Sequence, residues 1–164
     1  MIEEPLIRAA QRGDTVAMNE VLDALTPYVG RICGPIALND GADAAQEALI
    51  AIFRGLRGLR EPAALFGWAR AIAVHEALRV ARRSALERPA ELAGVPARDD
   101  ATLAADIRDM LDRLAPEHRA VLMLRDVEGL DERTAAALLR VPKGTVKSRL
   151  ARARESFRKG WLRQ

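Results

Sequence analysis

The sequence has 164 residues, of which 49% are hydrophobic and 30% charged, so it can bury helical cores and is not a disordered tail. Only 4% of the residues are aromatic, and alanine, leucine and arginine dominate, which predicts an all-α protein and argues against a β-sandwich or barrel. The net charge of +3 is small but uneven, because residues 140–164 hold nine Lys or Arg side chains and one acid.

The single cysteine, Cys33, excludes an internal disulfide and a cysteine-rich zinc site. We interpret it as a small core residue rather than a redox thiol. No apolar run approaches the roughly 20 residues that span a bilayer, and residues 1–5 lack the basic start of a signal peptide. We therefore expect a cytoplasmic protein without membrane insertion, metal or cofactor.

The N-terminal third predicts helices separated by breaks. Residues 6–25 have helical apolar spacing, and Gly13-Asp14 predicts a break within them. Pro27 can begin a further helix, which Gly34-Pro35 interrupts.

Residues 42–56 predict a helix with two distinct faces, preceded by a turn at residues 39–41. The expected buried stripe contains Ala45, Ala48, Leu49, Ile52 and Leu56. A mixed row of Asp43, Glu47, Ile50 and Arg54 lies on the opposite side. This row is either an ordinary solvated face or a contact surface for a partner.

A basic loop at residues 55–62 precedes a helix predicted for residues 63–83. Its apolar positions are Leu65, Trp68, Ile72, Leu78 and Val80, with Trp68 interpreted first as core. Its polar positions are Arg70, His75, Arg79, Arg82 and Arg83. His75-Glu76 resembles the start of a zinc-protease helix, but Arg79 stands where the second histidine is required, which excludes that site.

Residues 84–101 contain Pro89, Gly94 and Pro96 without an apolar period, which predicts a flexible linker. Thr102 is a suitable cap for the next helix, and Pro116 begins another whose core includes Val121 and Leu124.

The C-terminal stretch predicts two helices around a tight turn. Asp131 can cap a helix that ends near Leu139, and Pro142 terminates it before a second helix begins at Thr145. Val146, Leu150, Ala153 and Phe157 fall on one apolar face of that second helix, and the remaining faces are basic. This is the pattern of a helix-turn-helix that offers a recognition helix to a DNA major groove. The simpler alternative is a solvated helical hairpin with an arginine-rich exterior.

Three segments resemble bacterial RNA polymerase sigma factors of the extracytoplasmic-function (ECF) group. Residues 124–159, "LRDVEGLDERTAAALLRVPKGTVKSRLARARESFRK", behind "LAPEHRAVL" at 114–122, resemble the DNA-reading C-terminal domain. "DGADAAQEALIAIFRGL" at 40–56 resembles the segment that docks on the clamp helices of the polymerase. "LFGWARAIAVHEALRVARR" at 65–83 resembles the helix that melts promoters and reads the minus-ten element.

The resemblance implies a region 2-like helical domain at 1–83, a linker at 84–101 and a region 4-like helix-turn-helix domain at 102–164. It implies polymerase contacts at Asp43, Gln46, Glu47 and Ile50. It implies minus-ten contacts at Trp68, His75, Arg79, Arg82 and Arg83, with Ile72 and Ala73 also at matching positions. It implies minus-thirty-five contacts at Arg125, Lys147, Ser148, Arg149, Ala151 and Arg152.

The implied protein is not an enzyme but a sigma factor that directs promoter-specific transcription initiation. Its implied partners are core RNA polymerase through the clamp helices and flap, promoter DNA as duplex and melted strand, and an anti-sigma factor. Two alternatives remain: a stand-alone helix-turn-helix regulator, and an interaction protein that only sequesters polymerase or an inhibitor.

Three positions depart from the family pattern, and one of them is Glu132, which replaces a common tyrosine of the helix-turn-helix. His75 replaces a frequent asparagine, which implies a different base preference at the minus-ten element. Arg140 replaces the usual glycine of the helix-turn-helix turn, where a left-handed backbone would cost roughly 1 kcal/mol.

Overall fold

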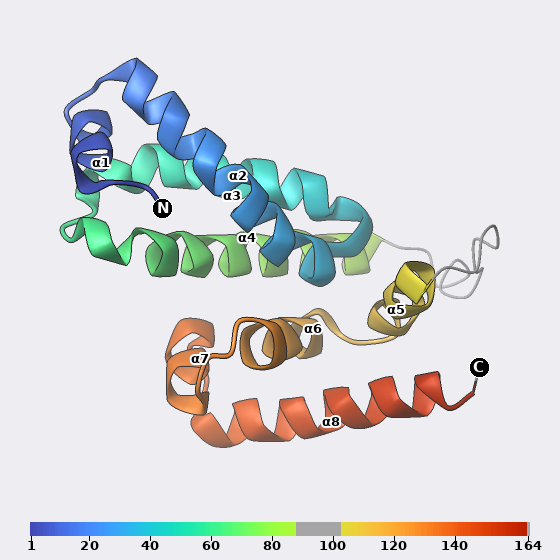
Figure 1. Ribbon diagram of the computed structural model, residues 1–164. Helices are drawn as coiled ribbons and strands as arrows, with labels where there is room; N and C mark the ends of the chain where they lie inside the picture. The colour runs from blue at the N-terminus through green and yellow to red at the C-terminus, as the bar shows by residue number, and fades with distance from the viewer. Residues whose placement is uncertain (88–102, 164) are drawn as a thin grey trace. The chain divides into compact units, whose positions relative to one another are not determined.

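The computed structural model describes residues 1–87 and 103–163, and every regular element in these ranges is helical (Figure 1). This confirms the predicted all-α class. The chain divides into two compact units, Met1–Val80 and Ala81–Gln164.

The first unit begins with two helices joined by a short turn. Gly13 in the turn has a φ of +98°, and the Asp14 carboxylate caps the next helix by accepting hydrogen bonds of 3.0 Å from the backbone N–H groups of Val16 and Ala17. The predicted break at Gly13-Asp14 is therefore confirmed. In chain order the elements are α1 Glu4–Gln11, α2 Thr15–Ala37, η1 Leu38–Asp40, α3 Gly41–Gly55, η2 Leu56–Gly58, η3 Pro62–Ala64 and α4 Leu65–Glu87.

Helix α2 continues through both of its prolines, so the predicted new helix at Pro27 and interruption at Pro35 are wrong. An interior proline costs about 3 kcal/mol, while each large apolar side chain that becomes buried contributes about 1.5–3 kcal/mol. The buried stripe on both sides of Pro27 outweighs that cost. It comprises Val21, Leu25, Val29, Ile32, Cys33 and Ile36, each 0% exposed.

Helices α2, α3 and α4 enclose the core of the first unit (Figure 1). Small side chains let them approach closely: the Cys33 Sγ of α2 lies 3.6 Å from the Ala73 carbonyl oxygen of α4. A Cβ built on Gly55 would lie 2.9 Å from the Trp68 indole, so only glycine fits under that ring without displacement. Trp68 is half-buried in this contact.

The buried face of α3 is rotated from the predicted one. Ala44, Ala48, Ile52 and Leu56 are 0% exposed, whereas Ala45 and Leu49 are only half-buried. The sequence pattern could not distinguish Ala44 from Ala45 because both are small and apolar.

Helix α4 begins at Leu65, after the short helix η3, and reaches Glu87. Residues 84–87 were predicted as linker but are helical, since Ala85, Leu86 and Glu87 are strong helix formers. The rest of the predicted linker, together with the predicted cap Thr102, lies outside the described residues.

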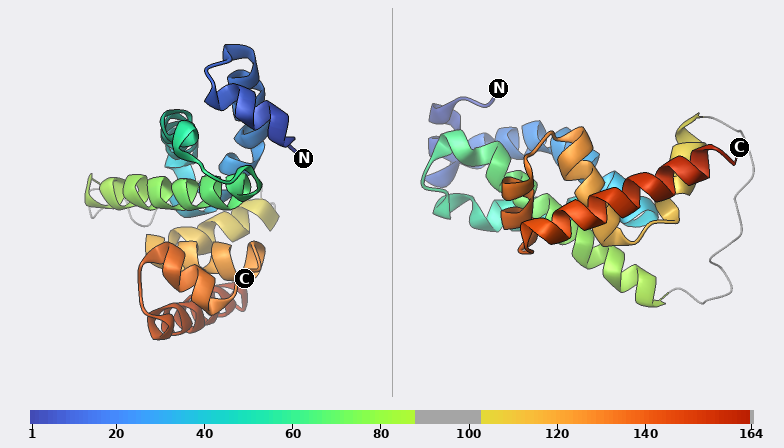
Figure 2. Two further views of the ribbon diagram at one scale, coloured as in Figure 1. Left: turned by 90° about the vertical axis from the view of Figure 1, so that its left-hand side faces the viewer. Right: turned by 90° about the horizontal axis from the view of Figure 1, so that it is seen from below.

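The second unit is built around its longest helix, α8 (Figure 2). Helix α6 packs along α8, α7 lies at its N-terminal end, and α5 lies toward its C-terminal end, where Met110 contacts the backbone at Gly160. The elements are α5 Leu103–Asp112, α6 Pro116–Leu122, the π-helical turn η5 Met123–Val127, α7 Glu132–Leu139 and α8 Lys143–Trp161.

The turn between α7 and α8 has the predicted cap and the predicted left-handed residue, but α8 begins earlier than predicted. The Asp131 carboxylate accepts a 2.7 Å hydrogen bond from the Thr134 N–H, and Arg140 ends α7 with φ 56° and ψ 43°, the left-handed conformation. Helix α8 begins at Lys143, two residues before the predicted Thr145. The reason is that the Pro142 carbonyl already accepts the first helical hydrogen bond, 3.0 Å from the Thr145 N–H.

Candidate functional site

Helix α8 has one buried face and one exposed cationic face. Val146, Leu150 and Ala153 are at most 5% exposed, which confirms the predicted apolar stripe, although Phe157 is only half-buried. The structure leaves four of the predicted minus-thirty-five residues exposed on the solvent side of this helix: Lys147, Ser148, Ala151 and Arg152.

Arg149 is half-buried at the border of the buried face, and its charge acts on Glu117 and His118 of α6. Burial lowers the pKa of His118 on α6, and the positive charges of Arg149 and, more weakly, Arg152 lower it further. Because its pKa is lowered from an ordinary 6.5, His118 is neutral at neutral pH and adds no charge to the basic face of α8.

Two arginines of the second unit are engaged within it. The Arg125 guanidinium donates to the Leu130 carbonyl oxygen and is half-buried, so it holds the loop before α7 instead of extending into solvent. The Arg154 Nε donates to the Asp126 carboxylate at 3.0 Å, and this ion pair fastens the η5 turn to α8. Both contacts support the orientation of the recognition helix.

The predicted minus-ten residues fall on one side of α4. At 100° per residue, Trp68, Ile72, His75, Arg79, Arg82 and Arg83 all lie within about one third of the helix circumference. Ala73 lies on the opposite side and is 0% exposed, so its predicted place among these contacts is wrong. The periodicity of α4 assigns Ala73 to the core.

The predicted polymerase row is exposed on α3. Asp43, Gln46, Glu47 and Ile50 share one face, and the Ile50 side chain is 38% exposed although it is apolar. Such a row, with two carboxylates around an apolar side chain, suits a partner surface with basic and apolar groups.

An ion-pair cluster connects this row to α4, and the sequence analysis missed it. The Arg79 guanidinium donates to the Glu76 carboxylate from Nε at 2.9 Å and from Nη2 at 2.7 Å. Its Nη2 also lies 3.7 Å from the Glu47 carboxylate. The i, i+3 spacing of Glu76 and Arg79 was a usable signal for the first contact, but no sequence signal indicated the second.

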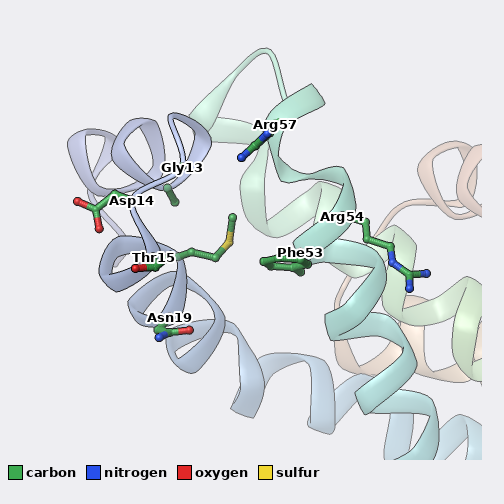
Figure 3. Close-up of a pocket in the computed structure, with 9 residues that line it drawn as sticks. Gly13, Asp14, Thr15, Asn19, Phe53, Arg54 and Arg57 are labelled. Carbon is green, nitrogen blue, oxygen red and sulfur yellow. The ribbon is translucent and has the colours of Figure 1, made fainter.

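A pocket lies on another side of the first unit, where the turn from α1 to α2 faces the end of α3 (Figure 3). Phe53, 53% exposed, stands opposite Thr15 and Asn19, and Arg57 points toward Gly13. The Gln11 amide fixes this corner by donating to the Leu56 and Leu59 carbonyl oxygens at 2.9 and 2.7 Å. Of the row that the sequence indicated on α3, only Arg54 lines this pocket, and none of the residues that the resemblance marks as DNA or polymerase contacts does.

Two negative findings apply to residues 1–87 and 103–163. No group of three or more His, Cys, Asp or Glu side chains in these ranges could hold a metal ion. No helix there combines the length and the apolarity that crossing a membrane requires.

Comparison with known proteins agrees with this arrangement. Residues 104–157, which include α6, α7 and most of α8, match the family "Sigma-70, region 4". The ECF RNA polymerase sigma factor SigE of Mycolicibacterium smegmatis is 36% identical over 89% of this chain, and the match spans 63% of that relative. The ECF RNA polymerase sigma-E factor of Haemophilus influenzae is 27% identical over 94% of this chain and 93% of its own length.

Over most of its length the chain is therefore similar to ECF RNA polymerase sigma factors, and residues 104–157 match region 4 of the sigma-70 family. Solved structures of sigma factors share its fold. The sigma factor RpoE of Bartonella quintana, crystallised with the anti-sigma factor NepR, is similar with a TM-score of 0.68 and 20% identity, over 88% of this chain and 96% of that one. CnrH in complex with the cytosolic domain of CnrY is similar with a TM-score of 0.62 and 19% identity, over 97% of this chain and 96% of that one.

Proposed function

We propose that this chain is a sigma factor, which binds core RNA polymerase and directs it to promoters by contacting the minus-ten and minus-thirty-five elements. The observation that carries the proposal is the exposed cationic face of α8, which lies opposite a buried stripe in the segment that matches "Sigma-70, region 4". The proposed role is one of binding, and it assigns no catalytic residue.

The minus-thirty-five contacts would come from α8. Arg152 can donate to a guanine edge and Ser148 can donate or accept, while Lys147 and Arg149 would mainly neutralise phosphates. Because Ala151 has a small side chain, α8 could approach the base edges in the major groove closely at this position. Arg125 would act through the loop that it holds in front of α7.

The minus-ten contacts would come from the α4 stripe. Arg79, Arg82 and Arg83 provide cations along a melted strand, and His75 offers a hydrogen-bond donor and acceptor to a base. Stacking would contribute little, because Trp68 is packed over Gly55.

The polymerase would dock on the α3 row. We propose Ile50→Asp as a probe of this contact, with Val16→Asp on α2 as the matched control, since Val16 is also exposed (66%). Ile50→Asp should reduce capture of this sigma factor by immobilised core polymerase, whereas Val16→Asp should not. Equal capture of both variants would remove the α3 row from the proposal.

We also propose an anti-sigma partner. The similar RpoE was solved with the anti-sigma factor NepR, and CnrH with the cytosolic domain of CnrY. A protein of this kind would compete with core polymerase for the chain.

A run-off transcription assay tests the whole proposal. Core polymerase alone, core with the wild-type chain, and core with the Arg152→Ala variant are compared on fragments of the source genome. We expect no promoter-specific transcripts from core polymerase alone, such transcripts with the wild-type chain, and a smaller amount of them with the Arg152→Ala variant. Duplex binding without any transcript would instead favour a stand-alone regulator.

A further inference from the structure

Arg79 lies on the proposed DNA-binding stripe, yet in the free protein it is held by two carboxylates. Its guanidinium donates to Glu76 on its own helix and lies 3.7 Å from Glu47 on α3. Glu47 belongs at the same time to the row proposed to dock on polymerase. One ion pair therefore joins a DNA-facing cation to a polymerase-facing anion.

The contact between Glu47 and Arg79 can open readily. Both side chains are 51% exposed, and ion pairs at this exposure are weak because water screens them. The Glu76 contact is shorter and involves two donors, and the Glu76 side chain is only 24% exposed. Of the two acids, Glu47 is thus the one that a partner can remove.

Two binding events compete for this pair. A phosphate of a DNA strand competes with Glu47 for Arg79, and a basic group of a docking partner competes with Arg79 for Glu47. Binding of DNA to Arg79 releases Glu47 for the partner, and binding of the partner to Glu47 releases Arg79 for DNA. Each binding event therefore favours the other, because thermodynamic coupling is reciprocal.

We propose that Glu47 restrains Arg79 in the free protein and that engagement of Glu47 by a basic surface of core polymerase releases Arg79 for the promoter strand. This inference rests on the proposed function, whose docking row and DNA stripe it connects. Glu76 remains bound to Arg79 in both states and acts as a positioning residue, since the five N–H donors of a guanidinium leave others for phosphate.

The test is a double-mutant cycle on the full chain without polymerase. Binding of a fluorescein-labelled oligothymidine strand is measured by anisotropy at low salt for the wild type, Glu47→Gln, Arg79→Gln and the double variant. Asp43→Asn is the matched control, because it removes the same charge from the same row four residues away and forms no ion pair within the described residues.

We expect Glu47→Gln to bind the strand about two- to fourfold more tightly than the wild type, in keeping with the strength of an exposed ion pair. Asp43→Asn should change binding less, and the gain from Glu47→Gln should disappear in the Arg79→Gln background. Equal gains from Glu47→Gln and Asp43→Asn, a gain that persists without Arg79, or no binding by any variant would each overturn the proposal.

A second arm repeats the measurement with saturating core polymerase. The wild type and Glu47→Gln should then bind the strand equally, because polymerase has already removed Glu47 from Arg79. A gain that remains in the holoenzyme would overturn the role of polymerase in the release. A wild-type chain that never captures core would refute the proposed function itself, while the cycle on the free chain is decided separately.

Discussion

The Arg119 guanidinium donates a 2.5 Å hydrogen bond to the Leu114 carbonyl oxygen, just beyond the end of α5. It also reaches the Leu111 carbonyl at 3.3 Å, and the residue is only 7% exposed. Arg119 thus supplies a donor to the Leu114 carbonyl and a second donor to the Leu111 carbonyl, which also accepts from the Leu114 N–H at 3.0 Å, and it connects α5 to α6.

Arg119→Met should therefore lower the opening free energy of the second unit by about 2–3 kcal/mol, because the carbonyl oxygen of the buried Leu114 loses its charged donor. Native-state amide hydrogen exchange in α6 measures this quantity. The exposed Arg113→Met is the control and should change it by less than about 0.5 kcal/mol. Similar values for both variants would contradict the structural role of Arg119.

Arg140→Gly should stabilise the second unit by about 1 kcal/mol, since Arg140 has a φ of 56° and glycine adopts this conformation without steric strain. Thermal unfolding of the full chain measures the change. Ala137→Gly, in the exposed middle of α7, should act in the opposite direction by a similar amount. A lower midpoint for Arg140→Gly would show that the arginine side chain contributes more than the turn costs.

The cap at Asp131 should make stability depend on pH. The hydrogen bond from the Thr134 backbone N–H, followed by that from the Thr134 hydroxyl, lowers the pKa of Asp131 below its ordinary 3.8. A lowered pKa in the folded state means that the cap stabilises fully above pH 3.8 and is lost as the pH falls through the folded value. Asp131→Ala should be less stable than the wild type at pH 7, and the difference should shrink below pH 4 in urea denaturation. A difference that is independent of pH would contradict the cap.

Cys33 should resist alkylation. Burial, with a smaller contribution from the charge of Glu76, raises the pKa of its thiol to about 12, and the side chain is 0% exposed. Iodoacetamide at pH 8 should leave the native protein unmodified in mass spectrometry and label it completely in urea. Labelling at equal rates in both conditions would show that the core opens around α2.

Arg152→Ala should weaken binding to a duplex with the cognate minus-thirty-five element by about 1–3 kcal/mol. Arg158→Ala is the control, because it removes an equal charge from the last turns of the same helix. A fluorescence anisotropy titration distinguishes the two, and equal losses would indicate that α8 provides only general positive charge.

The periodicity of α8 was sufficient to predict its buried and exposed faces, because burial of a continuous stripe dominates the energetics of this helix. In α4 the large apolar side chains Trp68 and Ile72 were predicted as core but are half-buried, and several core positions are filled by small residues, Ala69, Ala73 and Ala77, each 0% exposed. The break at Gly13 and the turn at Arg140 followed from local backbone preference. The helix break predicted at the prolines of α2 was wrong. The prediction considered the local cost of a missing backbone N–H donor but not the free energy gained when the apolar side chains of α2 are buried against α3 and α4.

Within the candidate site, the sequence predicted only those properties that follow from the register of a single helix. The exposure of Lys147, Ser148 and Arg152 follows from the register of α8. The contacts of Arg79 with Glu47 and of Arg125 with Leu130 depend on how separate segments meet, and no spacing within a single helix specifies them. Tertiary contacts decide which cations are already paired.

The close fit of Trp68 over Gly55 has a practical consequence. The sequence has two tryptophans, and they fall in different units: Trp68 in the first and Trp161, 49% exposed, at the end of α8 in the second. Replacing one indole at a time would give each unit its own intrinsic fluorophore. Emission from the remaining ring could then report whether polymerase, DNA or an inhibitor perturbs that half of the chain.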